Sequence, residues 1–448
     1  MRRGAGPPAC PRGSAKCCRP LLQSPETTPA SPTYPMRVGR QAHACSYAWL
    51  VCRLAVKARY TSVRAAQPWR SEPIMLSGIK IVEICGIGPG PFCAMHLADL
   101  GADVIAVERT VPDEAAAALA EGSVLNRGKR SVVADLKTAE GRELVLRLIE
   151  DADALIEGMR PGVMERLGLG PDVCHRRNPR LVYGRMTGWG QSGPMAQAAG
   201  HDNNYIALSG ALFYNGSPAE PPSSAITLVG DIGGGALYLA VGVLSGILNA
   251  RATGKGTVVD AAIVDGSAHM LQLLLATGKK GFVTGARGQN IHDSSHFYAT
   301  YRCADGHFVT LGSIEPQFYA LLLQKLGVAA DPRFARQWDR KHWPELHRHF
   351  TELFASKTRA EWCALLENTD VCFGPVLSPQ EAARHPHNVA RGVYFERDDQ
   401  LQAAPAPRFD GKARSAGPIP KRGQHTGEIT ATLGSGNASQ VWRAARAD

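Results

Sequence analysis

The chain has 448 residues, of which 44% are hydrophobic and 20% are charged, as in an ordinary globular protein with two or three domains. Its formal net charge at pH 7 is +10. Residues 1–74 hold 12 Lys and Arg against two acidic residues, so they account for the whole excess. Residues 75–448 are therefore neutral overall, which argues against a nucleic-acid-binding body.

Residues 1–74 also differ from the rest in composition. They are rich in Pro, Ser and Arg, show no helical or strand period, and hold five of the 11 cysteines without C-x-x-C spacing. We expect a disordered or non-native basic extension, with Met75 as the functional start. No secretory signal pattern is visible, so a cytoplasmic location is expected. The alternative is a mitochondrial location, if this arginine-rich segment is a genuine transit sequence.

From Met75 onward, short apolar strands alternate with helices. Residues 79–85 predict a strand, Pro91 and Gly101 can open and close a helix, and residues 102–107 predict a second strand. Further strands are expected at 131–136, 153–159 and 180–188, with a helix at 139–152. This alternation predicts an α/β fold with a doubly wound parallel sheet.

The first turn resembles a dinucleotide fingerprint, with glycines at 86, 88 and 90 and Glu108 about twenty residues on. Pro91 stands where the third glycine of G-x-G-x-x-G is required. Pro89 and Pro91 also remove two N–H donors from the loop that would hold pyrophosphate. We therefore expect no nicotinamide cofactor.

Four cations follow predicted strands. Arg109, Lys137, Arg160 and Arg166 would lie at the carboxyl ends of parallel strands, where open α/β sheets bind ligands. A single arginine there is usually only solvated. Four at one edge favour a site for a polyanionic ligand.

Two acidic positions stand out in the middle of the chain. His201 and Asp202 lie side by side before an apolar segment, a pattern that a simple turn also explains. Asp231 precedes a glycine-rich stretch that predicts a helix start, and an N-cap role would account for it. The amides of Gly233, Gly234 and Gly235 at that start are candidate donors to an oxyanion.

The pattern changes near residue 294. Residues 297–314 predict a hairpin that turns at Ala304, Asp305 and Gly306, and helices are expected at 315–327, 343–356 and 359–369. We therefore expect a large domain at 75–265, a linker and small α+β domain at 266–403, and a segment at 404–448 that returns to the large domain. The longest apolar run, 236–248, is about a dozen residues and too short to cross a bilayer. The six cysteines of the body are expected to be buried, reduced thiols.

These motifs, taken in order, resemble those of the alpha-methylacyl-CoA racemases, a branch of the family III CoA-transferase superfamily. The resemblance covers about residues 76–409 and rests on "GIGPGPFCAMHLADLGADV", "ADLK", "EGMRPGVMERLGLGP", "RMTGWGQSGP", "GHDNNYIALSG", "LVGDIGGG", "GSIEPQFYA" and "PAPRF". It implies a Rossmann-like large domain, a smaller domain and an interlocked homodimer. It further implies an acyl-CoA substrate, with no separate cofactor, no metal, no nucleic acid and no membrane.

The resemblance also assigns residues. His201, supported by Glu315, and Asp231 would be opposed bases that move a proton between the two faces of an α-carbon. Residues implied in CoA binding are Arg109, Ala134, Asp135, Leu136, Lys137, Gly158, Met159, Arg160, Arg166, Gly200, Asp202, Asn203, Asn204 and Tyr205.

One alternative remains within the superfamily. In its transferases the aspartate at position 202 is the nucleophile, and an aromatic residue and a glutamine usually stand at positions 201 and 206. Here those positions are His201 and Ile206, which favours the racemase branch. The sequence does not determine the acyl chain, because apolar pockets tolerate changes in methylene count.

Overall fold

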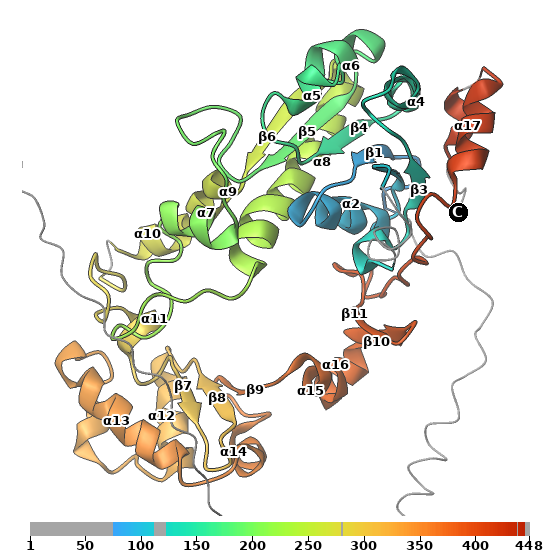
Figure 1. Cartoon of the computed structure of the whole chain (residues 1–448). Helices are drawn as coiled ribbons and strands as arrows, with labels where there is room; N and C mark the ends of the chain where they lie inside the picture. Colours follow the sequence, from blue (N-terminus) through green and yellow to red (C-terminus); the bar gives the residue numbers. More distant parts are fainter. Residues whose placement is uncertain (1–74, 112–121, 279–280, 437, 444–448) are drawn as a thin grey trace, which may run out of the picture. The chain divides into compact units, whose positions relative to one another are not determined.

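The computed structural model describes residues 75–111, 122–278, 281–436 and 438–443 (Figure 1). All of them lie in one unit of internal contacts, Arg70–Asp448. The expectations for residues 1–74 concern a part of the chain outside the described residues.

The central element is a six-stranded parallel sheet with the strand order β3-β2-β1-β4-β5-β6. This is the order of dinucleotide-binding folds, and it confirms the predicted doubly wound α/β sheet. The chain first winds outward from β1 to β3 and then outward on the other side from β4 to β6, so the direction of winding reverses between β1 and β4. The strands are β1 (Lys80–Ile84), β2 (Asp103–Glu108), β3 (Arg130–Val133), β4 (Ala154–Glu157), β5 (Val182–Thr187) and β6 (Thr257–Ala262).

Alternate strand residues fill two separate cores, one on each face of the sheet. On one face Val82 packs with residues of α4 (Ala139–Ile149) and α17 (Thr426–Gly434). On the other face Ile81 packs with residues of α2 (Pro89–Asp99) and α8 (Leu237–Thr253). Because both faces are covered, the strands read as continuous apolar runs rather than alternating ones.

The C-terminal segment covers the β3 edge of the sheet. The Ser131 amide donates to His425 Nδ1 (3.1 Å), and the Val133 amide donates to Thr426 Oγ1 (3.0 Å). Trp442 lies in the same core as α17. The segment therefore supplies partners for backbone groups that an edge strand would otherwise leave open.

A second, antiparallel sheet has the order β7-β8-β9 and its own aromatic core. The predicted hairpin is present as β7 (Thr300–Arg302) and β8 (Phe308–Leu311). Strand β9 (Phe373–Val376) pairs with β8 and was not foreseen, since its sequence FGPV contains two strand breakers. The accompanying helices are α12 (Pro316–Leu326), α13 (Trp343–Phe354) and α14 (Arg359–Leu366).

The remaining elements are short. They are η1 (Val124–Asn126), α5 (Val163–Arg166), α6 (Pro171–Arg177), α7 (Asp202–Leu208), η2 (Leu228–Ala236), α9 (Ile263–Met270), α10 (Gln272–Gly278), α11 (Ile291–Ser294), η3 (Pro332–Ala335), η4 (Arg340–His342), α15 (Pro379–Arg384), α16 (Pro386–Arg391), β10 (Tyr394–Arg397), β11 (Gln400–Ala403) and η5 (Ala438–Val441). Strands β10 and β11 form an antiparallel pair.

The apolar run in the middle of the chain is longer than expected. Elements η2 and α8 form one helical stretch over Leu228–Thr253, which has 26 residues and contains an 18-residue segment with a mean hydropathy of 1.6, so it is long and apolar enough by composition to cross a membrane. The expected length of about a dozen residues was wrong, because η2 continues the helix. In the structure Leu239, Val243 and Ile247 are buried in the core beneath the sheet, so this is a core helix of the fold.

The six cysteines of the body are free thiols, as expected. Cys93, Cys174 and Cys303 are buried. Cys372 is exposed, which corrects the expectation of burial for that residue. It stands just before β9, where the backbone has a positive φ of 52°.

A buried ion pair joins three parts of the fold. Arg127 Nη2 donates to Asp99 Oδ2 (2.6 Å) and Nε donates to Oδ1 (3.1 Å), while Nη1 donates to the Ala403 carbonyl (2.8 Å). Both charged side chains are at most 5% exposed. The guanidinium thus ties the end of α2 and the end of β11 to the chain after η1.

Removing this cation should be costly. Arg127→Leu would leave Asp99 buried without its partner, which we expect to lower the free energy of unfolding by about 3–5 kcal/mol. Arg177→Leu is the control, because Arg177 pairs with Glu143 and Glu150 in solvent and should contribute about 0–1 kcal/mol. Urea unfolding of the full chain measures both, and equal losses would contradict the assignment.

Candidate functional site

The expected ligand edge lies at the carboxyl ends of the six strands. Open α/β sheets bind ligands at the point where the direction of winding reverses, which lies here between β1 and β4. The loop after β1 contains Gly86, Ile87 and Gly88, and the Ile87 side chain is 97% exposed. Gly88 has a positive φ of 74° and precedes α2. The loop after β4 contains Gly158 and Arg160.

Helix α7 carries the histidine–aspartate pair. His201 precedes the helix in an extended conformation, and its backbone amide donates to Asn204 Oδ1 (3.0 Å). The His201 side chain is exposed, whereas Asp202, the first residue of the helix, is buried. The Asn204 side chain, three residues after His201, thus caps the N-terminus of the helix.

Asp231 lies in a π-helix, which the sequence did not indicate. The element η2 begins at Leu228, so Asp231 is its fourth residue and not the N-cap that we expected. The Ile232 amide donates to the Thr227 carbonyl (3.1 Å), five residues back. Gly233, Gly234 and Gly235 lie inside the same element, where amides serve such bonds. The expectation that they are free oxyanion donors at a helix start is therefore wrong.

The glycines of η2 instead allow close packing. A Cβ on Gly230 would overlap Asp202 Oδ1, and a Cβ on Gly234 would overlap Ser267 Oγ. A Cβ on Gly233 would lie 3.1 Å from Met270 Cε. The absence of side chains thus lets α7 and α9 approach the π-helix backbone directly. Such π-helical turns are frequent at functional sites.

The two aspartates are joined by a hydrogen bond. The Asp231 amide donates to Asp202 Oδ1 (2.8 Å). Burial raises the pKa of the Asp231 carboxyl, the charge of Asp202 raises it further, and His201 acts in the opposite direction. Asp231 Oδ2 lies 3.5 Å from the position of a Cβ on Gly88. The structure therefore brings His201, Asp202 and Asp231 together beside the β1 loop.

Tyr205 connects this group to the β4 loop. Its hydroxyl donates to the Gly200 carbonyl, and its ring meets the Trp189 ring edge-on, with centroids 4.7 Å apart. Burial and the charge of Asp231 raise the pKa of Tyr205, while Arg160 opposes them. Trp189 was not among the expected site residues. Its two flanking glycines were the available signal, because a Cβ on Gly188 would overlap the Tyr205 ring.

The other residues implied in CoA binding follow strand ends. Arg109 follows β2, Lys137 lies four residues after β3, and Arg166 ends α5. These three cations and Arg160 are exposed, and none of them forms an ion pair within the described part of the chain. The remaining ones are Ala134, which is buried, Asp135, Leu136, Met159 and Gly200, which are partly buried, and Gly158, Asn203 and Asn204, which are exposed.

Glu108 is not available to bind a ribose. It is buried, its Oε1 accepts from Ser131 Oγ (2.5 Å), and its Oε2 lies 3.6 Å from Arg422 Nε. Both carboxylate oxygens of Glu108 are thus already directed at partners inside the protein. The near-match to a dinucleotide fingerprint is thus not accompanied by the acid that it needs.

Glu315 has no described interaction with either of the other two candidate catalytic residues. It is exposed and directly precedes α12, and its charge adds to burial in raising the pKa of Cys372. No contact among the described residues joins it to His201. One chain therefore brings together His201 and Asp231 but not Glu315. The described residues also contain no cluster of three or more His, Cys, Asp or Glu placed to hold a metal ion.

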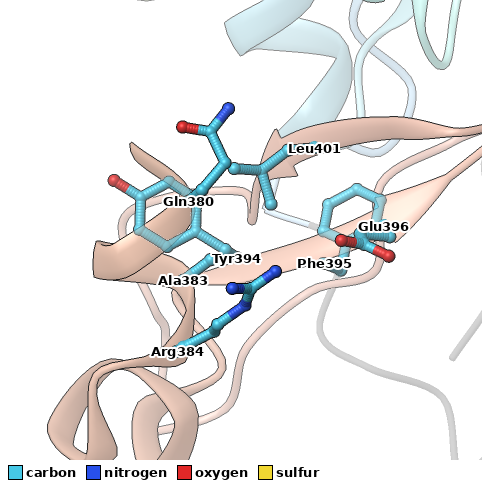
Figure 2. A pocket seen from close by; sticks show the side chains of 7 residues that line it. All are labelled: Gln380, Ala383, Arg384, Tyr394, Phe395, Glu396 and Leu401. Carbon is cyan, nitrogen blue, oxygen red and sulfur yellow. The ribbon is translucent and has the colours of Figure 1, made fainter. Parts of the chain in front are cut away.

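A pocket of about 200 Å³ that is open to solvent lies elsewhere, between α15 and the β10–β11 pair (Figure 2). None of the candidate site residues lines it. Figure 2 shows the side chains that line it, which belong to helix α15 and to strands β10 and β11. They are Gln380, Ala383, Arg384, Tyr394, Phe395, Glu396 and Leu401.

The profile of CoA-transferase family III matches residues 76–426, most of the chain. The chain belongs to this family. It is 43% identical over 365 residues to the human alpha-methylacyl-CoA racemase, covering 80% of this chain and 93% of that protein. It is 32% identical over 335 residues to an acetyl-CoA:oxalate CoA-transferase from Acetobacter aceti, covering 71% of this chain and 85% of the relative.

Solved structures agree with the family assignment. The crystal structure of a CAIB/BAIF family protein from Brucella suis matches with a TM-score of 0.68 at 28% identity, covering 81% of this chain and all of that chain. The family resemblance inferred from the sequence motifs and the α/β fold of one chain that it implied are confirmed.

The packing of Gly230 can be tested directly. In Gly230→Ala the added methyl group must displace Asp202, and we expect a loss of about 1–3 kcal/mol in unfolding free energy from overpacking. Gly427→Ala in α17 is the control, since a Cβ there meets nothing within 4 Å. Thermal unfolding compares the two, and a stable Gly230→Ala protein would contradict the close approach.

Proposed function

We propose that this protein epimerises 2-methylacyl-CoA thioesters from (2R) to (2S) by removing the α-proton on one face and returning a proton on the other. No cofactor is needed beyond the CoA of the substrate. The observation that carries the proposal is the placement of His201 and Asp231 together at the carboxyl edge of the sheet. Identity of 43% to a racemase over most of the chain supports it.

The residue types suit a proton transfer through an enolate. Inversion requires two acid/base groups, one in its deprotonated form to accept a proton while the other holds a proton to return. A neutral histidine can accept a proton near pH 7. An aspartic acid can return one only if its pKa is raised, and burial together with Asp202 acts on Asp231 in that direction.

The exposed cations would hold the CoA part of the substrate. Arg109, Lys137, Arg160 and Arg166 follow the strands or loops of one sheet edge and have no ion-pair partner among the described residues. Charge-assisted bonds to phosphates would anchor the nucleotide while the acyl end reaches His201 and Asp231. The charges of both Asp231 and Arg160 act on the Tyr205 hydroxyl, so Tyr205 is our candidate for the place where the two parts of the substrate meet.

We further propose that the active enzyme is a homodimer in which Glu315 of one chain supports His201 of the other. Within one chain no described contact joins these residues. Large apolar side chains are exposed on α8, with Val241 65% and Leu248 69% exposed. A second copy would cover such a surface.

The alternative is a CoA-transferase that uses Asp202 as its nucleophile. Two relatives named as CoA-transferases are 32% and 31% identical to this chain. The buried Asp202 carboxylate already accepts the Asp231 amide, which leaves it poorly placed to attack an acyl group. The experiment below distinguishes the two activities.

Either His201→Ala or Asp231→Asn should suppress epimerisation by roughly 100-fold or more, since each removes one of two acid/base groups. Each variant should keep some deuterium exchange with one enantiomer, with opposite preference. Proton NMR of (2R)-2-methylacyl-CoA in D2O, followed by chiral analysis, measures both effects.

The control for this pair is Asp202→Asn, which should lose less activity. A transferase would behave in the opposite way: Asp202→Asn would be inactive, hydroxylamine would trap an acyl group on Asp202, and His201→Ala would keep near-normal turnover. That combination would refute the racemase proposal.

Arg109→Ala and Arg166→Ala should raise KM for the acyl-CoA with a smaller change in kcat, because they remove binding that is equal in the ground and transition states. Arg177→Ala is the control, since its partners Glu143 and Glu150 lie on α4 and beside it. Steady-state kinetics gives both constants. A fall in kcat at constant KM would show that these arginines act in the chemical step.

A further inference from the structure

The Asp202 side chain is held in the site but has no part in the proton transfer described above. Its side chain lies at the start of α7 in a residue that is 8% exposed, and Oδ1 accepts the Asp231 amide at 2.8 Å. Gly230 lies against it, so close that a Cβ would overlap Oδ1. The carboxylate is therefore packed directly on the backbone of residues 230 and 231.

The surroundings of Asp231 contain few other charges. Among the described residues, the charges that bear on it are those of Asp202 and His201, both from the start of α7. The β1 loop offers Gly88, and α9 offers Ser267 and Met270 to the glycines of η2.

The other ionisable groups near Asp231 either form a hydrogen bond with another residue or are uncharged. On α9, His269 Nδ1 bonds to the Tyr238 hydroxyl (2.7 Å). Tyr205, also from α7, is held protonated by burial and by the Asp231 charge, which raise its pKa. From β5, the residue that reaches η2 is Met186, at Gly235. Asp202 thus supplies the negative charge at this point.

We propose that Asp202 is a positioning residue of the proton-transfer site: its carboxylate fixes the backbone of Asp231 and lies beside it as a like charge, so that a proton on the Asp231 carboxyl is available for return to the substrate. The inference rests on the proposed racemase function, in which Asp231 must both accept and donate a proton.

The physical reason is that an aspartate with an ordinary pKa is poorly suited to return a proton to the substrate. A carboxyl group with a pKa near 4 is almost fully ionised at pH 7 and rarely has a proton to give. Burial and a like charge both disfavour the ionised form, and the structure applies both to Asp231. A hydrogen bond to the backbone amide, rather than to the Asp231 carboxylate, lets Asp202 do this without competing for the proton.

The test replaces the charge and keeps the acceptor. Asp202→Asn retains an oxygen for the Asp231 amide but is neutral. Carbon-13 NMR of the full chain, labelled at aspartate carboxyls, follows the titration of Asp231, and its signal is assigned by its loss in Asp231→Asn. The midpoint should move to lower pH in Asp202→Asn, because a like charge has been removed. The acid limb of the kcat/KM profile should move in the same direction.

Two further variants complete the design. Asp202→Ser, a smaller neutral acceptor, should give the same direction of shift and serves if Asp202→Asn does not fold. Asp265→Asn, an exposed aspartate on α9, is the matched control and should leave the Asp231 midpoint in place. An unmoved midpoint in both neutral Asp202 variants overturns the inference.

The titration needs no substrate, so the two hypotheses fail in different ways. If the racemase proposal is wrong, the wild-type protein exchanges no deuterium into a 2-methylacyl-CoA, whatever Asp231 does. If only the role of Asp202 is wrong, exchange is normal and the Asp231 midpoint is unmoved in the variants.

Discussion

The site depends on backbone-to-backbone approach at the π-helix η2. Gly266 on α9 meets the Gly234 carbonyl so closely that a Cβ would overlap it, and Gly230 meets the Asp202 side chain in the same way. Three elements, α7, η2 and α9, can therefore share a space that normal side chains would fill. Protein interiors are packed tightly enough that one methyl group at such a point has to displace a neighbour. This constraint places the Asp231 carboxyl between the β1 loop and the histidine of α7.

The large-scale fold could be predicted from the sequence because its signals are local and repeated. Apolar strands with helices between them determine a parallel sheet, and the turn at Ala304, Asp305 and Gly306 determines the hairpin. Strand ends were less predictable: a strand was expected over 131–136, yet β3 is Arg130–Val133 and ends two residues before the charged Asp135. Strand β9 carries a glycine and a proline and is accepted only because it lies at a sheet edge.

The candidate site was predictable in its residue types but not in its backbone. His201, Asp202 and Asp231 were identified from motifs, and the structure brings them together. No local signal separates a glycine-rich π-helix from the glycine-rich start of an α-helix, since the difference lies in tertiary contacts with α9. The same is true of Glu108, whose partner Arg422 is distant in the sequence. Trp189 was missed because its role depends on a ring contact with Tyr205.

The closing of the β3 edge by residues 425 and 426 has a consequence for biosynthesis. The hydrogen-bond acceptor of the Ser131 amide, His425, lies 294 residues later in the chain. At roughly 5–20 residues per second of translation, β3 remains an open sheet edge for about 15–60 s after it leaves the ribosome. An unpaired apolar edge is a template for aggregation during that interval. The late synthesis of the C-terminal segment thus leaves the β3 edge open to intermolecular pairing after the other strands of the sheet have been made.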